Sequence, residues 1–130
     1  MTELMYVCSP YRGDVENNVI YARKLTRLAI ENGFCPVTVH LYMTQALDDN
    51  DPEEREAGLK AGQEILKQCK YVLVGNASGY SEGMLAELDI ALAMGKIILM
   101  PDYFEDKITA DFNVVELNEI VEGWRKDHGD

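Results

Sequence analysis

The sequence predicts an α/β fold, a three-layer sandwich in which helices cover both faces of a parallel sheet of four to five strands. Three observations predict it. Short apolar, β-prone runs alternate with longer stretches whose apolar residues recur every three or four positions. The strand runs are apolar on both sides, which is typical of strands buried in a parallel sheet. The order is strand, helix, strand, loop, helix, strand, helix, strand, and right-handed crossovers then place helices on both faces.

Length and composition indicate one domain, residues 1–130, with 47% hydrophobic residues. No apolar run reaches the roughly 18–20 residues needed to span a bilayer. The start, MTELMYVCSP, lacks the basic region of a signal peptide, so we expect a cytoplasmic protein. Three cysteines without a close pair fit a reducing compartment and give no zinc spacing. The net charge of −11 opposes nucleic-acid polymers and anionic membranes, but a small anionic ligand could bind where a pocket is locally positive.

The first strand is expected at residues 4–8. The segment SPYRGD (9–14) then breaks regular structure through its proline and glycine. A helix follows over 16–32, with Asp14 as N-cap and Gly33 in the left-handed conformation that commonly ends a helix.

The second strand is expected at Cys35 to His40. The stretch LYMTQALDD (41–49) follows with a single helical turn, in which Leu41, Met43 and Leu47 are apolar. Asp51 and Pro52 form a strong helix start, because aspartate caps the first turn and proline suits its first position. This helix is expected to run to about Cys69.

The third strand is expected at 71–74, before a Gly-rich turn. Ser81 then serves as N-cap of a helix over 82–94, and a fourth strand at 96–100 is closed by Pro101.

After Pro101 the pattern weakens, and residues 102–112 are expected to form a polar loop. Apolar residues at helical spacing predict a C-terminal helix over 114–124, with a short strand at 112–115 as the alternative.

Glu87 occupies an unusual position in the helix predicted at 82–94. At about 100° per residue from Met84, it falls near 300°, between Met94 and Ala91 and inside the apolar arc. A carboxylate there is costly unless it is hydrogen-bonded, paired or functional. The alternative is a glutamate at the helix edge whose stem packs while its head reaches water.

Ligands of open parallel sheets bind beyond the carboxyl ends of the strands. An anion could be held there by Arg12 with the amides of the first loop, or by Ser81 with the first amides of its helix. An ordinary loop and a plain N-cap are the alternatives, since neither segment is a P-loop or a GxGxxG motif. The candidate binding residues at this edge are Ser9, Arg12, Gly13, His40, Asn76, Ser81, Gly83 and Met84.

Other residues carry weaker signals. His40 could bind a ligand or act as an acid or base, or it could be structural, and with only His128 as a second histidine no metal site is expected. The acidic run 48–51 lacks EF-hand spacing and is interpreted as a solvated approach to a helix. Cys8 lies in a strand with nothing nearby to lower its pKa, which disfavours it as a nucleophile. Loop tyrosines that could cover a base or sugar ring are Tyr11, Tyr42 and Tyr80.

Four motifs together carry a family resemblance: YVCSPYRGDVENN, PVTVH, DDNDPEER and SEGMLAELDIALAMGK. In this combination, over roughly residues 5–100, the chain resembles the nucleoside 2-deoxyribosyltransferase-like superfamily, and in particular a branch of small bacterial and phage proteins. The resemblance implies a flavodoxin-like or Rossmann-like sandwich, a homodimer or higher homo-oligomer, and an active site at the carboxyl edge of the strands. It implies a nucleoside or nucleotide substrate and no cofactor.

The resemblance also implies roles for single residues. Glu87 matches the glutamate that attacks the anomeric carbon in catalytic members, with Tyr11 or His40 orienting the base or the glutamate. Ser81 matches a serine that contacts phosphate in relatives that hydrolyse nucleoside 5′-monophosphates, and Arg12 lies in the loop where those relatives also hold phosphate. The implied activity is cleavage of the N-glycosidic bond or deoxyribosyl transfer, and through Ser81 and Arg12 the sequence resembles the monophosphate N-glycosidases more than the transferases.

Lys70 departs from the family pattern, because relatives usually carry aspartate at this position. The alternative function is therefore a non-catalytic nucleotide-binding protein, such as a sensor or a protein that sequesters a nucleotide signal. A purely structural assembly protein would require Glu87 to be buried without an open cavity.

Overall fold

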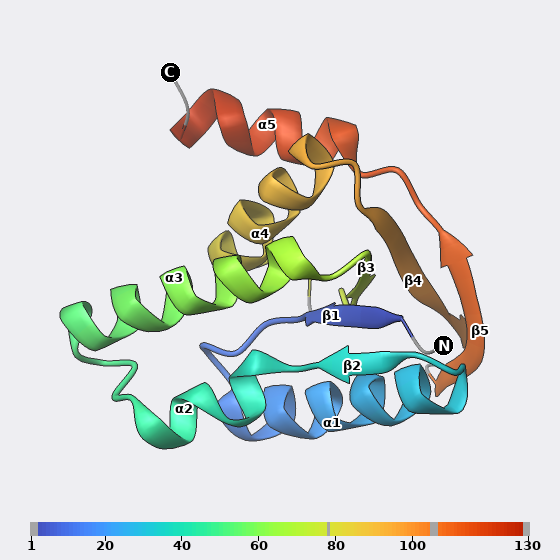
Figure 1. Ribbon diagram of the computed structural model, residues 1–130, viewed down its shortest axis with the longest axis horizontal. Coiled ribbons are helices and arrows are strands. Elements are labelled where there is room, and N and C mark those ends of the chain that lie inside the picture. The colour runs from blue at the N-terminus through green and yellow to red at the C-terminus, as the bar shows by residue number, and fades with distance from the viewer. Residues whose placement is uncertain (1–2, 78, 105–106, 129–130) are drawn as a thin grey trace.

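The computed structural model of the protein describes residues 3–77, 79–104 and 107–128. These residues form a five-stranded sheet in the order β2-β1-β3-β4-β5 (Figure 1). The strands are β1 (Leu4–Cys8), β2 (Cys35–Val37), β3 (Tyr71–Val74), β4 (Ile97–Phe104) and β5 (Lys107–Val114). The helices are α1 (Val15–Glu31), the 3-10 turn η1 (Val39–Leu41), α2 (Met43–Ala46), α3 (Pro52–Gln68), α4 (Glu82–Ala93) and α5 (Asn118–His128). The predicted α/β class is confirmed, with β1 to β4 parallel and β5 antiparallel to β4.

Helices lie on both faces of the sheet, with α1 on one side and α3 and α4 on the other (Figure 1). Side chains of a strand alternate between faces, so β1 contributes to two separate cores. Met5 and Val7 pack with Leu25 of α1. Tyr6 and Cys8 point into the core that contains α3 and α4. The core that contains α3 and α4 therefore brings β1 next to α4, the helix that carries Glu87.

The predicted helix starts are confirmed at side-chain level. The Asp14 carboxylate accepts from the backbone of α1, and Asp51 does the same for α3, where Pro52 occupies the first turn. Ser81 Oγ accepts from the Met84 N–H at the start of α4. Each cap satisfies an amide that would otherwise lack a partner in the first turn.

The second strand is shorter than predicted, since it ends at Val37 and the chain then forms η1. The prediction of a strand to His40 is wrong because Val39, 5% exposed, leaves the sheet to pack in the core on the α3 and α4 side. The Thr38 carbonyl accepts from the Leu41 N–H, which closes the turn. His40 therefore lies on a helical turn and not at the end of a strand.

The predicted loop after Pro101 is also wrong. β4 continues through Pro101 to Phe104, and β5 returns beside it. Proline is tolerated there because β3 pairs with β4 only as far as Leu99, so the missing N–H has no neighbouring strand to meet on that side. The C-terminal helix is present but starts later than predicted, at Asn118.

Gly75 is expected to be intolerant of any side chain. A Cβ at this position would lie 2.8 Å from Tyr21 Oη and would also collide with Leu25, which is fully buried. We expect Gly75→Ala to lower the free energy of unfolding by about 1–3 kcal/mol in urea titrations. Gly123→Ala is the control, because a Cβ there meets nothing within 4 Å, and in a helix it should stabilise by about 0.5–1 kcal/mol. Equal stability of the two variants would contradict the crowding at Gly75.

Candidate functional site

A cavity of about 340 Å³ opens at the carboxyl edge of the sheet, between α3 and the start of α4. Small-molecule sites usually measure about 300–1,000 Å³, so this one suits a ligand of modest size. Its walls come from β1, the loop after β1, the segment from η1 to α2, α3 and α4. Among the residues that line it are Tyr6, Tyr11, Arg12, His40, Asp49, Arg55, Ser81, Glu82, Gly83, Met84 and Glu87.

Glu87 lines this cavity and is only 8% exposed. The Tyr6 hydroxyl donates to Glu87 Oε2. The Cys8 thiol lies 3.9 Å from Oε1 and donates to it weakly. Both partners come from one face of β1. The strand therefore holds the carboxyl group from the side of the sheet, and the cavity lies beside the carboxyl group. The predicted position inside the apolar face of the helix is confirmed, and the carboxyl head does not reach open water.

Burial sets the protonation states of Glu87, Tyr6 and Cys8. It raises the pKa of Glu87 to about 7, although hydrogen bonds from Tyr6 and Cys8 act in the opposite direction. Burial also raises the pKa of the Tyr6 hydroxyl and of the Cys8 thiol, with the Glu87 charge adding to both. Tyr6 and Cys8 therefore stay protonated as donors, and Glu87 is the group that titrates near neutral pH.

The loop after β1 is held in place by Asn18 of α1, a residue that the sequence did not single out. Its amide donates to the carbonyls of Tyr11 and Arg12, at 3.0 and 3.1 Å. Tyr11 stacks on His40, with ring centroids 5.6 Å apart. Burial lowers the pKa of His40, so its ring is uncharged at neutral pH. The two predicted residues thus form one aromatic wall of the cavity.

Arg12 lies on the cavity, but its guanidinium is bonded to Asp49. Nε donates to the Asp49 carboxylate at 2.8 Å and Nη2 to its backbone carbonyl at 2.9 Å. Arg55 of α3 contacts the same carboxylate at 3.3 Å. The interpretation of residues 48–51 as merely solvated is therefore wrong for Asp49, which joins two arginines at the cavity.

Three predicted binding residues do not line this cavity. Ser9 is fully buried, and its Oγ has no partner among the residues described. Gly13, with φ at +97°, borders a separate hollow, and Asn76 donates to Tyr80 Oη at 3.3 Å. The remaining predicted site residues line the cavity together: Tyr11, Arg12, His40, Ser81, Gly83, Met84 and Glu87.

Lys70 precedes the first residue of β3, at the opposite edge of the sheet from the cavity. Its Nζ lies 5.5 Å from the centre of the Tyr71 ring. The lysine that stands here in place of the aspartate of relatives is therefore not part of the cavity wall.

A protein-family model described as "Domain of unknown function (DUF7768)" matches residues 3–100. The chain belongs to this family. Curated proteins give no match. Among solved structures, the DUF7768 chain is similar to one titled "2-desoxiribosyltransferase from Leishmania mexicana". The two are 13% identical with a TM-score of 0.50, over 97% of this chain and 98% of that chain, which shows a shared Rossmann-like fold.

The DUF7768 match contains β1, α3, α4 and every residue that lines the cavity. Helix α5 lies beyond it. No helix in the described part of this DUF7768 chain is long and apolar enough to cross a membrane.

Proposed function

We propose that this protein cleaves or transfers the N-glycosidic bond of a (deoxy)nucleoside or nucleoside 5′-monophosphate, with Glu87 as the nucleophile. The observation that carries the proposal is a buried carboxyl group facing a cavity at the carboxyl edge of the sheet, with two protonated donors behind it. The fold shared with a protein titled a 2-desoxiribosyltransferase adds support.

The first step needs an ionised Glu87. Its Oε1, which accepts only the weak hydrogen bond from the Cys8 thiol, attacks the anomeric carbon and forms an ester bond, while the bond from that carbon to the base nitrogen breaks and its electron pair leaves with the base. A carboxylate stabilises the positive charge that develops on the sugar in the transition state. The Tyr6 hydroxyl holds the other oxygen and fixes the orientation of the carboxylate.

The second step regenerates the carboxylate. Water attacks the anomeric carbon in hydrolysis, or a nitrogen of a second base attacks it in transfer, and the ester bond to Glu87 breaks. The proton lost by the attacking group balances the proton taken up by the departing base.

The other cavity residues would hold the substrate. Tyr11 and the uncharged His40 ring offer a flat surface and hydrogen-bonding atoms for the base. The start of α4 lines the cavity with Ser81, Gly83 and Met84 and would face the sugar or its 5′ substituent, with the Met84 N–H already donating to Ser81 Oγ. Arg12 could bind a phosphate only by exchanging its contacts with Asp49.

One observation favours binding without turnover as the second candidate. With a pKa of about 7, Glu87 carries its proton in much of the population at neutral pH. A protonated carboxyl group donates a hydrogen bond to a ligand and is a poor nucleophile. The same cavity would then capture a nucleoside or nucleotide intact.

Release of free base tests the proposal. The four deoxynucleosides and their 5′-monophosphates are incubated with the protein, with and without a second base, and the products are separated by chromatography. Release that scales with protein concentration, with a deoxyribosyl mass on the peptide containing Glu87 after acid quench, supports catalysis. Ligand-induced thermal stabilisation without release supports the binding function. Absence of both release and stabilisation overturns both.

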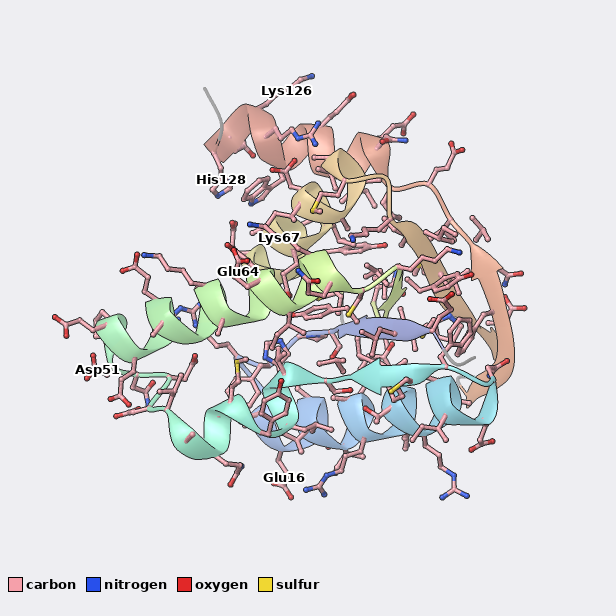
Figure 2. The ribbon with its side chains drawn as sticks, in the orientation of Figure 1. Glu16, Asp51, Glu64, Lys67, Lys126 and His128 are labelled. Atoms are coloured by element: carbon pink, nitrogen blue, oxygen red, sulfur yellow. The ribbon has the colours of Figure 1, made fainter. Side chains whose placement is uncertain are left out.

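The control for that assay is Glu64→Gln, an exposed carboxylate of α3 that pairs with Lys67 away from the cavity (Figure 2). It should release base at the wild-type rate.

A further inference from the structure

Helix α3 presents two glycines to the cavity, Gly58 and Gly62, one helical turn apart. Glycine inside a helix costs about 0.5–1 kcal/mol of stability relative to alanine. Both residues lie within the regular helix, so their backbone conformation would also suit alanine. The reason for a missing side chain must therefore lie in the space beside the helix.

Each glycine makes room for a different neighbour. A Cβ at Gly62 would lie 3.2 Å from Tyr6 Oη and 3.7 Å from Val39 Cγ2, the second of which is an ordinary contact. A Cβ at Gly58 would lie 3.2 Å from Leu47 Cδ1. Non-bonded contacts between carbon atoms are most favourable at about 3.5–4.0 Å, so a methyl group at either glycine would crowd one atom. At Gly62 that atom is the hydroxyl oxygen that donates to Glu87.

Tyr6 has little freedom to move away from an added methyl group. Its side chain is fully buried, and its strand, β1, lies between β2 and β3 in the sheet. Its hydroxyl lies between two helices, beside Gly62 of α3 and bonded to Glu87 of α4. A close-packed interior transmits small displacements, and a hydrogen bond weakens steeply as its geometry departs from the optimum. A side chain at Gly62 would therefore disturb the bond between Tyr6 and Glu87.

We propose that Gly62 is a positioning residue of the site, which keeps the Tyr6 hydroxyl on Glu87 by leaving the space that this hydroxyl occupies beside α3. The inference rests on the proposed function and deepens it, because the bond from Tyr6 favours the ionised form of Glu87. The ionised form is the one that attacks the anomeric carbon. Gly62 thereby helps to set the pH above which the nucleophile is available.

A substitution at Gly62 leaves the other ionisable groups around Glu87 in place. Cys8, on the same face of β1 as Tyr6, is the second donor to the carboxyl group, and Tyr42 acts on the pKa of Tyr6. The other charged or titratable side chains on the cavity wall are Arg12, His40, Asp49, Glu54, Arg55 and Glu82. A change in the pKa of Glu87 in Gly62→Ala therefore reports on the Tyr6 hydroxyl.

The experiment follows the ionisation of Glu87 with and without turnover. NMR of protein labelled isotopically at the glutamate carboxyl carbons gives a titration midpoint, assigned to Glu87 by its loss in Glu87→Gln. The pH profile of base release gives the kinetic midpoint. Gly62→Ala should raise both midpoints by about half to one pH unit, less than Tyr6→Phe, because the hydroxyl is displaced and not removed.

Gly58→Ala is the matched control. It adds the same methyl group to the same helix and narrows the same cavity, but it meets only the tip of Leu47, a half-buried side chain that can turn aside. Both midpoints should stay at their wild-type values in this variant.

The double variant Tyr6→Phe/Gly62→Ala identifies the hydroxyl as the crowded atom. Phenylalanine leaves a space beside α3 that the alanine methyl group can fill. Gly62→Ala should therefore add no further shift to the midpoint of Tyr6→Phe, and it should raise the melting temperature of that variant. If Gly62→Ala alone does not fold, the double variant decides: a folded protein with the midpoint of Tyr6→Phe supports the inference, and an unfolded one overturns it.

The two proposals fail in different ways. If base is released but Gly62→Ala raises neither midpoint, or if the double variant is shifted beyond Tyr6→Phe, this inference fails while the proposed function stands. If no protein releases base, wild type included, the proposed function fails, and the NMR midpoints still decide whether Gly62 positions the hydroxyl.

Discussion

Glu87→Gln should remove base release and, at alkaline pH, should make the folded protein more stable. Glutamine keeps the size of the side chain and can still accept from the Tyr6 hydroxyl, so the cavity should keep its shape. Its amide oxygen cannot form the glycosyl ester, and we expect base release to fall by about 1000-fold or more.

The stability change follows from the raised pKa of Glu87. The unfolded chain ionises this group near its ordinary value of 4.5, whereas the folded protein holds the proton up to about pH 7. Between pH 4.5 and about pH 7 the folded state binds more protons than the unfolded chain. The stability of the folded protein is therefore greatest below pH 4.5 and falls as the pH rises through about 7. The difference between the two pKa values corresponds to about 3 kcal/mol of stability, which is lost at pH values above both. Glutamine does not ionise, so the variant does not lose this stability.

Thermal unfolding at pH 5 and pH 8.5 measures this effect. At pH 8.5 the variant should melt about 10 °C above wild type, and the two should be closer at pH 5. Glu64→Gln should show neither change, because that carboxylate is exposed and lies outside the cavity. A variant that melts below wild type at pH 8.5 would contradict the burial of an ionisable carboxyl group. Undiminished base release would eliminate Glu87 as the nucleophile.

The part of the fold that carries the site was predictable, because its signals are local. Asp14, Asp51 and Ser81 each cap the helix that follows them, and a cap needs only the next three residues. The prediction that the strand ends at Pro101 is wrong because a proline can lie inside a strand where no neighbouring strand needs its N–H, and that depends on the whole sheet. The strand that follows it is held by pairing with β4, so its own polar sequence gave little sign of it.

The position of Glu87 in the apolar face was predictable from helical spacing, but its partners were not. Tyr6 meets it across 81 residues of sequence, and only strand alternation, which places Tyr6 and Cys8 on one face, could have suggested the pair. Asp49 joins Arg12 of the first loop to Arg55 of α3 at the cavity. Long-range polar contacts of this kind depend on how the loops are placed, which periodicity does not specify.

Tyr6→Phe should move the pH dependence of base release to higher pH. The wild-type rate should rise with pH and be half-maximal near pH 7, since the nucleophile must lose its proton and its pKa is about 7. The Tyr6 hydroxyl stabilises the ionised form, so its removal raises the pKa of Glu87 further. A hydrogen bond to a charged group is worth about 1.5–3 kcal/mol, which corresponds to a shift of about one to two pH units.

The pH profile of base release distinguishes stabilisation of the Glu87 carboxylate by the Tyr6 hydroxyl from simple packing of the Tyr6 ring. Phenylalanine keeps the ring in the core, and the lost hydroxyl leaves only a small space beside Gly62 of α3. The rate at pH 7 should therefore fall about tenfold or more and recover towards wild type near pH 9. Tyr71→Phe is the control, because Tyr71 begins β3 at the far edge of the sheet and does not line the cavity. An unshifted midpoint with a rate lowered equally at all pH values would show that Tyr6 supports only the packing around Glu87, and that the carboxylate is stabilised by other groups.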